Sequence, residues 1–260
     1  SNTVLFNLII ASIIPFLIWG PFFPDLIVSV SALFFLYFVL KNNNFYYLNN
    51  KLFIIFLLFC IFSTISSLES KDISLSIKSS LFYFRIGLFS CFVWYLIDKD
   101  KSILSYFYYA LVICFSSLVI DGYFQYFTGA NLLGYKLEGI RISSFFGTEW
   151  IMGSYLSRLF PLLFALFLVK QKHKFEIYFI GLLFVLVDVL IFMSGERSSF
   201  FYLNLSTVFI IILIKEYQKF RLITLIFSFV LIGILTLSSD KLAERMIKGP
   251  AKSMGLEIVE

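Results

Sequence analysis

The sequence predicts an all-α protein, a polytopic bundle of transmembrane helices. Of its 260 residues, 60% are hydrophobic and 14% are charged, and the mean hydropathy is +0.93. The apolar residues form long runs without the alternation that is typical of strands. Because the hydrocarbon core of a bilayer offers the backbone no hydrogen-bond partners, such runs are expected to cross it as helices. The composition excludes a disordered chain, a collagen-like repeat and a disulfide-stapled secreted domain.

The chain divides at its charged residues into nine apolar windows. A helix needs about 20 residues, in a range of about 17 to 25, to cross roughly 30 Å of hydrocarbon. We therefore predict about nine spans in a transmembrane domain of residues 1–239, at 1–24, 26–40, 52–68, 79–97, 102–120, 150–169, 177–195, 198–214 and 222–239. The charged segments that end these windows begin, in order, at Asp25, Lys41, Glu69, Asp98, Asp121, Lys170, Glu196, Lys215 and Asp240. The window 26–40 is the shortest, and we expect it to cross with little tilt or to borrow Phe22 and Phe23.

The basic residues between the windows favour a cytoplasmic amino end. In that orientation the inner side holds Lys41, Lys51, Lys99, Lys101, Lys170, Lys172, Lys174, Lys215, Lys219 and Arg221, whereas the outer connections hold Lys71, Lys78, Lys136, Arg141 and Arg197. This bias of about two to one follows the positive-inside rule. Residues 240–260 then begin a periplasmic loop or tail. Since the chain starts without Met and stops in a polar stretch, we expect it to be part of a longer protein.

The histidine and the cysteines predict no metal site, cofactor or catalytic triad. His173 is the only histidine and lies in a Lys-rich inner loop, where it is expected to be solvated. Cys60, Cys91 and Cys114 each fall inside a window and are expected to be small buried apolar residues. The net charge of +5 is spread over membrane-flanking loops, so we expect membrane lipids and no nucleic acid as partners.

Three charged residues fall inside the windows: Arg85, Arg158 and Asp188. A charge near the centre of a bilayer costs at least about 2.5 to 3.5 kcal/mol, so such residues usually face a partner or a water-filled cavity. Counted from the outer ends of their windows, all three lie roughly 10 to 13 Å below the outer surface. We therefore expect one cluster. One interpretation is a structural ion pair of Asp188 with Arg85 or Arg158.

The second interpretation is an outward-facing aqueous cavity that binds an anion. Two arginines against one aspartate leave a surplus positive charge, and the adjoining outer connections add Arg141 and Arg197 beside Glu149 and Glu196. A phosphate or diphosphate suits such a cavity because the guanidinium fork can bind it through two hydrogen bonds. The candidate substrate-binding residues are therefore Arg85, Arg141, Arg158 and Arg197.

The outer connection 121–149 is the longest between windows and is a candidate functional loop. Its glycines and aromatic residues, with few charges, are typical of a compact loop at the membrane interface, where a saccharide or lipid headgroup would bind. A packed re-entrant loop is an equally open interpretation. Beyond it, Gly153 and Ser157 lie four residues apart, which favours close helix contact. That contact would turn Arg158 toward the interior of the bundle or its near flank.

Several of these segments together resemble a known family. They are Asp121-Gly-Tyr-Phe-Gln-Tyr-Phe-Thr-Gly129, Arg141-Ile-Ser-Ser-Phe-Phe-Gly147 with Glu149, Gly153-Ser-Tyr-Leu-Ser-Arg158 with Pro161, and Ser194-Gly-Glu-Arg-Ser198. In their order, spacing and shared outer position they are similar to the O-antigen ligase and O-antigen polymerase superfamily of polytopic glycosyltransferases. The resemblance covers the topology of the whole chain and the motifs of residues 120–200.

The resemblance implies an enzyme of the bacterial inner membrane with a periplasmic active face. Such enzymes take a glycan from an undecaprenyl-diphosphate carrier. Ligases transfer it to lipid A-core, and polymerases transfer it to the next carrier-linked glycan. Arg141 and Arg197 then match the arginines that hold the carrier diphosphate, and Arg85 matches an arginine of an earlier span. Glu149 stands where polymerase-like members often have an acidic residue and ligases a Pro-Asn pair, which favours a polymerase over a ligase.

The resemblance leaves the catalytic base open. The family's chain continues through a large outer loop, which in ligases carries the histidine proposed as base, whereas this sequence stops at Glu260 and could be inactive on its own. Glu149 and Glu196 are candidate catalytic bases by position. Fixed arginines could stabilise the leaving diphosphate without a metal or other cofactor, and direct displacement with inversion at the anomeric carbon is the simplest expectation.

Two other functions stay open. A membrane transporter or flippase-like protein would use Arg85, Arg158 and Asp188 as an intramembrane pathway, although no internal repeat supports it. A non-catalytic assembly protein would need these charges only for packing.

Overall fold

The computed structural model describes residues 2–170 and 174–253, and His173 and Lys172 lie outside them. The chain is 82% helical, and the described residues form no strand beyond two isolated bridges, which confirms the all-α prediction. It divides into two compact units, residues 1–107 and residues 108–260. Each has its own core.

The first unit is a set of helices gathered around α3 and α6. Its helices are α1 (Asn2–Ala11), α2 (Ile13–Trp19), α3 (Phe22–Asn42), α4 (Lys51–Ser66), the 3-10 turn η1 (Ser67–Glu69), α5 (Ile73–Leu81) and α6 (Phe84–Lys99). In its core Phe35 of α3 meets Phe92 of α6, with ring centroids 5.7 Å apart. Asn50 begins α4 by accepting a hydrogen bond from the Phe53 amide at 2.9 Å, an N-cap that satisfies one of the free donors of the first turn.

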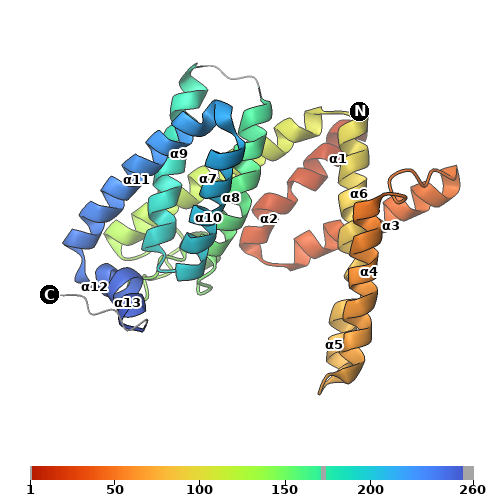
Figure 1. Cartoon of the computed structure of the whole chain (residues 1–260), viewed down its shortest axis with the longest axis horizontal. Coiled ribbons are helices and arrows are strands. Elements are labelled where there is room, and N and C mark those ends of the chain that lie inside the picture. Colours follow the sequence, from red (N-terminus) through yellow and green to blue (C-terminus); the bar gives the residue numbers. More distant parts are fainter. Residues whose placement is uncertain (1, 171–173, 254–260) are drawn as a thin grey trace. The chain divides into compact units, whose positions relative to one another are not determined.

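The second unit carries the proposed site. Its helices are α7 (Ser102–Thr128), which begins within the first unit, η2 (Ser144–Phe146), α8 (Met152–Val169), α9 (Lys174–Met193), α10 (Arg197–Leu213), η3 (Lys215–Tyr217), α11 (Gln218–Ser238), α12 (Asp240–Ala243), the π-helical turn η4 (Glu244–Lys248) and α13 (Gly249–Ser253). Helix α9 packs extensively on α11, and α10 on α8, as Figure 1 shows. The apolar windows of α8 and α9 are 56% and 61% buried, so these two helices form the centre of the unit.

Among the described residues, seven helical segments are long and apolar enough to span a membrane, which indicates a membrane protein. They are Phe22–Asn42, Lys51–Glu69, Ile73–Lys99, Ser102–Thr128, Met152–Val169, Lys174–Met193 and Lys215–Ser238. The first and eighth predicted windows correspond to shorter apolar helices, Val4–Trp19 and Arg197–Leu213. Many large apolar side chains are exposed, up to 90% for Leu237. Such a surface is suited to lipid and not to water.

Two predicted boundaries differ from the structure. Helix α7 continues to Thr128, so residues 121–128 are helical and do not belong to the loop. Asp121, whose charge set the predicted boundary, and Gln125 are fully buried within the unit and bind the loop that follows. The fourth window is interrupted, because α5 ends at Leu81 and α6 begins at Phe84. Arg85 therefore lies in the first turn of α6, near a break in the helix.

Candidate anion-binding site

The loop between α7 and α8 (residues 129–151) is held in one shape by the last turns of α7. Asp121 accepts hydrogen bonds from the Leu132 amide at 2.8 Å and from Ser144 Oγ at 2.6 Å. Gln125 Oε1 accepts from the amides of Ser143 and Ser144, at 3.1 and 2.8 Å. Ser144 has a φ of +50°, a conformation that a residue with a side chain seldom adopts without such support. These hydrogen bonds keep the loop compact against α7.

This clamp fixes the position of Arg141, two residues before Ser143. The Arg141 guanidinium stacks on the ring of Trp150, 4.4 Å from its centroid. Its Nε is buried and has no hydrogen-bond partner in the described part of the chain. Stacking orients a guanidinium while leaving its in-plane donors available. Because Nε is buried, the donors that Arg141 can offer to a ligand are those of its two terminal nitrogens.

Glu196 caps the first turn of α8. Its Oε1 accepts from the Gly153 amide at 2.7 Å, and its Oε2 accepts from the Ser154 amide at 2.9 Å and from Ser199 Oγ at 2.8 Å. A Cβ on Gly153 would lie 2.9 Å from Glu196 Oε1 and 2.6 Å from Ser194 Oγ, so only glycine allows this approach. Burial raises the pKa of the Glu196 carboxyl, while the three hydrogen bonds and the charge of Arg141 act in the opposite direction.

Glu149, the other predicted base, lies in a different environment. Its side chain is exposed at the end of the α7–α8 loop. The two carboxylates therefore differ in environment: Glu196 accepts hydrogen bonds from backbone amides, whereas Glu149 is exposed. The small-residue contact predicted at Gly153 and Ser157 is confirmed in part, since both residues are buried and Gly153 packs against residues 194–196. Arg158 is exposed, so of the two predicted directions the interior of the bundle is wrong and the near flank stays a prediction.

Arg197 is tied to an arginine that the sequence did not single out. Arg197 Nε donates to the backbone carbonyl of Arg245 at 2.8 Å, and Arg245 Nε donates to the carbonyl of Gly195 at 3.0 Å. Burial and the nearby charges of Arg141 and Arg197 lower the pKa of Arg245. No sequence signal pointed to Arg245, because its place in the site depends on the fold of residues 240–253 against Gly195.

An open cleft of about 1070 Å³ lies where the α7–α8 loop, the start of α10 and the C-terminal segment (α12, η4 and α13, residues 240–253) meet. Its charged lining consists of Arg141, Arg197, Lys241, Arg245 and Lys248 against Glu138, Asp240 and Glu244. Trp150 and the backbone around Gly139 and Gly249 complete it. The basic groups outnumber the acidic ones, and three of them are guanidinium groups. The structure thus brings the predicted residues Arg141 and Arg197 together in one cleft.

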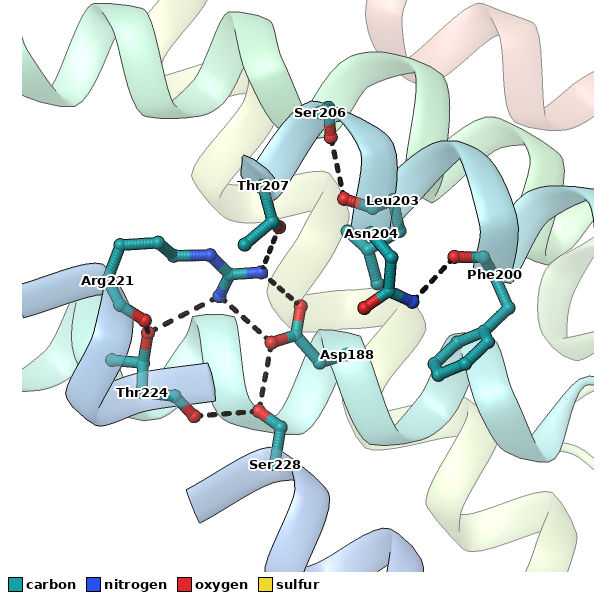
Figure 2. A network of polar contacts seen from close by, with 9 residues as sticks. All are labelled: Asp188, Phe200, Leu203, Asn204, Ser206, Thr207, Arg221, Thr224 and Ser228. Carbon is teal, nitrogen blue, oxygen red and sulfur yellow. Dashed lines mark hydrogen bonds and ion pairs between the residues drawn. The ribbon is translucent and has the colours of Figure 1, made fainter. Parts of the chain in front are cut away.

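The three charges predicted to cluster do not form one ion-pair cluster. Asp188 pairs with Arg221, not with Arg85 or Arg158. Both Arg221 terminal nitrogens bind the carboxylate, at 2.9 and 3.0 Å, as Figure 2 shows. Arg85 instead binds Asp25 at 2.7 Å and Ser29 Oγ at 2.8 Å, within the first unit. Depth alone could not predict these partners.

The prediction that Arg221 lies in the connection before the ninth window is also wrong. Arg221 is in the first turn of α11 and is 0% exposed. Thr207 Oγ1 of α10 accepts from its Nη2 at 2.7 Å, and Ser228 Oγ donates to Asp188 at 2.9 Å (Figure 2). The ring of Phe160 from α8 covers the guanidinium at 4.6 Å. The pair therefore joins four helices, and the predicted structural role of Asp188 agrees with this geometry.

Comparisons with known protein families, with curated proteins and with solved structures return no match to this chain. The described residues also contain no group of histidine, cysteine, aspartate and glutamate side chains arranged to hold a metal ion. The site therefore has to be interpreted from its own geometry.

Proposed function

We propose that this protein is a glycosyltransferase that takes a glycan from a polyprenyl-diphosphate carrier at the periplasmic face of the bacterial inner membrane. The observation that carries the proposal is the cleft in which Arg141 and Arg197 meet. Arg141 lies in the α7–α8 loop and Arg197 is the first residue of α10, and each is positioned by contacts that do not use all of its donors. Guanidinium groups arranged in this way suit an anionic ligand such as a diphosphate.

The chemistry that we propose is charge stabilisation of the leaving diphosphate. As the bond from the anomeric carbon to the carrier breaks, negative charge grows on the diphosphate, and fixed guanidinium groups lower the energy of that state. The acceptor hydroxyl, of a second carrier-linked glycan or of lipid A-core, must lose its proton to a base. Of the two predicted bases Glu149 fits better, because both oxygens of Glu196 already accept hydrogen bonds from the start of α8.

The transporter hypothesis receives less support. It invoked a pathway through Arg85, Arg158 and Asp188. Asp188 is neutralised by Arg221, and Arg85 is paired with Asp25. Both carboxylate oxygens of Asp188 and both terminal nitrogens of Arg221 are bonded within the bundle, which suits packing better than transport.

Deletion of the gene, followed by complementation and examination of the surface polysaccharide, tests the proposal. A polymerase predicts loss of long chains with single repeats still attached to lipid A-core. A ligase predicts loss of all repeats from the core, with carrier-linked polymer accumulating. Arg141→Ala and Arg197→Ala should each fail to complement at normal protein levels. Lys219→Ala, which removes an exposed basic residue from the start of α11, should complement fully. An unchanged polysaccharide profile after deletion would reject both activities.

A further inference from the structure

Arg197 and Arg245 each hold the segment of the other through their own Nε. Each uses its Nε to bind a backbone carbonyl of the opposite segment, at 2.8 and 3.0 Å. Hydrogen bonds at Nε fix the plane of a guanidinium and leave the edge formed by its two terminal nitrogens, which is an edge that can bind two phosphate oxygens. The crossed bonds therefore order two such groups side by side at the wall of the cleft.

Glycines at two positions make this close approach possible. Gly195 has a φ of +69°, and a Cβ there would lie 2.6 Å from Arg245 Nε. A Cβ on Gly249 would lie 2.9 Å from the Glu244 carbonyl and 3.3 Å from Arg197 Nη2. Arg245 itself is part of the π-helical turn η4 (Glu244–Lys248), and such turns are frequent at functional sites. The backbone is thus shaped around the two arginines.

Without a bound ligand, the positive charges of Arg141, Arg197 and Arg245 repel one another. Burial lowers the pKa of Arg245, and the like charges of Arg141 and Arg197 nearby lower it further. The acidic residues Glu138, Asp240 and Glu244 also line the cleft. Yet both Arg197 and Arg245 donate through Nε to carbonyls, and the described residues show no ion pair between any of the three arginines and a carboxylate. An anionic ligand would relieve the repulsion.

We propose that Arg245 is the third guanidinium of the anion site, and that the C-terminal segment brings it there so that the site binds a diphosphate in preference to a single phosphate. When each of three guanidinium groups binds through two donors, the donors outnumber the oxygens of a single phosphate. The oxygens of a diphosphate are enough for all three groups to bind in this way. The inference rests on the proposed function for the identity of the natural ligand, but the binding preference can be measured without any glycan transfer.

The test is binding of inorganic diphosphate and inorganic phosphate to the purified full chain in detergent, by isothermal titration calorimetry at constant ionic strength. The parent protein should bind diphosphate at least tenfold more tightly than phosphate. Arg245→Gln should weaken diphosphate binding at least tenfold and reduce this preference. Arg245→Lys keeps the charge but loses the planar fork, and should also weaken diphosphate binding. Lys252→Gln removes the same charge from an exposed position of α13 outside the cleft and should leave both affinities unchanged.

Each outcome decides the inference. Equal affinity of the parent and Arg245→Gln proteins for diphosphate, with unchanged helix content by circular dichroism, would overturn it, as would an equal loss in Lys252→Gln. If Arg245→Gln weakens binding but gene deletion leaves the polysaccharide unchanged, the anion site is real and the glycosyltransferase proposal is wrong. If Arg245→Gln binds normally while Arg141→Ala and Arg197→Ala abolish both binding and polysaccharide, the proposed function stands and the role of Arg245 does not.

Discussion

The bidentate contact between Asp188 and Arg221 shows how one residue pair can organise a helical unit. The two side chains are almost completely buried, at 3% and 0% exposed, and every oxygen of the carboxylate has a donor. Burying two charges is expensive, so the pair adds less to stability than its short distances suggest. The pair joins α9 to α11, and the bond from Arg221 to Thr207 joins both to α10.

Breaking this pair should be costly, whereas replacing it should not. Asp188→Ala leaves an uncompensated buried guanidinium, and we expect it to lower the free energy of unfolding by about 3–5 kcal/mol. The double variant Asp188→Leu with Arg221→Met should recover most of that loss. Asp25→Ala, which breaks the more exposed pair with Arg85, should cost no more than about 1 kcal/mol. Unfolding in mixed micelles measures all three, and equal losses for Asp188→Ala and Asp25→Ala would contradict the interpretation.

Glu196 and Glu149 allow a second comparison at this scale. Glu196→Gln places an amide donor against the backbone amides of α8, so we expect a loss of about 1–3 kcal/mol in unfolding free energy. Glu149→Gln is exposed and should change stability by no more than about 0.5 kcal/mol while abolishing any glycan transfer that uses it as base. Full stability of Glu196→Gln together with lost transfer would instead identify Glu196 as the base.

At the scale of helices, the start of α8 is the point on which the site depends. Its first amides are capped by a side chain from the next connection, and its second residue, Gly153, has no room for a Cβ. The same carboxylate lies close enough to feel the charge of Arg141 and is followed directly by Arg197. The cap therefore holds the Ser194–Ser198 motif and the first turn of α8 in fixed positions beside the cleft.

Two glycine substitutions should show that the start of α8 has no room for a side chain whereas α11 has. Gly153→Ala would drive a Cβ to 2.6 Å from Ser194 Oγ, and we expect it to cost about 1–3 kcal/mol through local displacement. Gly233→Ala in the middle of α11 meets nothing within 4 Å and should stabilise the helix by about 0.5–1 kcal/mol. Thermal unfolding in detergent measures both. A neutral Gly153→Ala variant would mean that α8 and the 194–196 segment are not in tight contact.

For the whole molecule, hydropathy predicted the helices because lipid requires every backbone amide to be bonded within the span. Its boundaries were wrong where polar residues are buried. Asp121 looked like the start of a loop but lies inside α7, and Arg221 looked like a loop residue but is in the core. The motifs around Arg141 and Arg197 predicted that the two residues lie at one site, and both line the same cleft. Arg245 could not be predicted, because its position depends on how the C-terminal segment folds back onto Gly195.

The predicted orientation can be tested by labelling. The native cysteines are buried, at 7%, 5% and 4% exposed for Cys60, Cys91 and Cys114, so background reaction should be low. Thr148→Cys in the α7–α8 loop should react with a membrane-impermeant maleimide in cells whose outer membrane is permeable. Lys101→Cys, before the start of α7, should react only after the inner membrane is opened. The reverse pattern would place the cleft in the cytoplasm and contradict the proposed location.

Helix α10 is short for a membrane span. Its 17 residues, Arg197–Leu213, are about 25 Å long, whereas the hydrocarbon core of a bilayer is about 30 Å thick. A span of that length is matched by local thinning of the bilayer beside it or by flanking side chains that reach for the headgroups. Arg197 is the first residue of α10 and also lines the cleft. Thinning of the bilayer at this end of α10 would bring lipid headgroups level with the arginines, so that a lipid-linked anion could enter the cleft with its hydrocarbon tail still in the membrane.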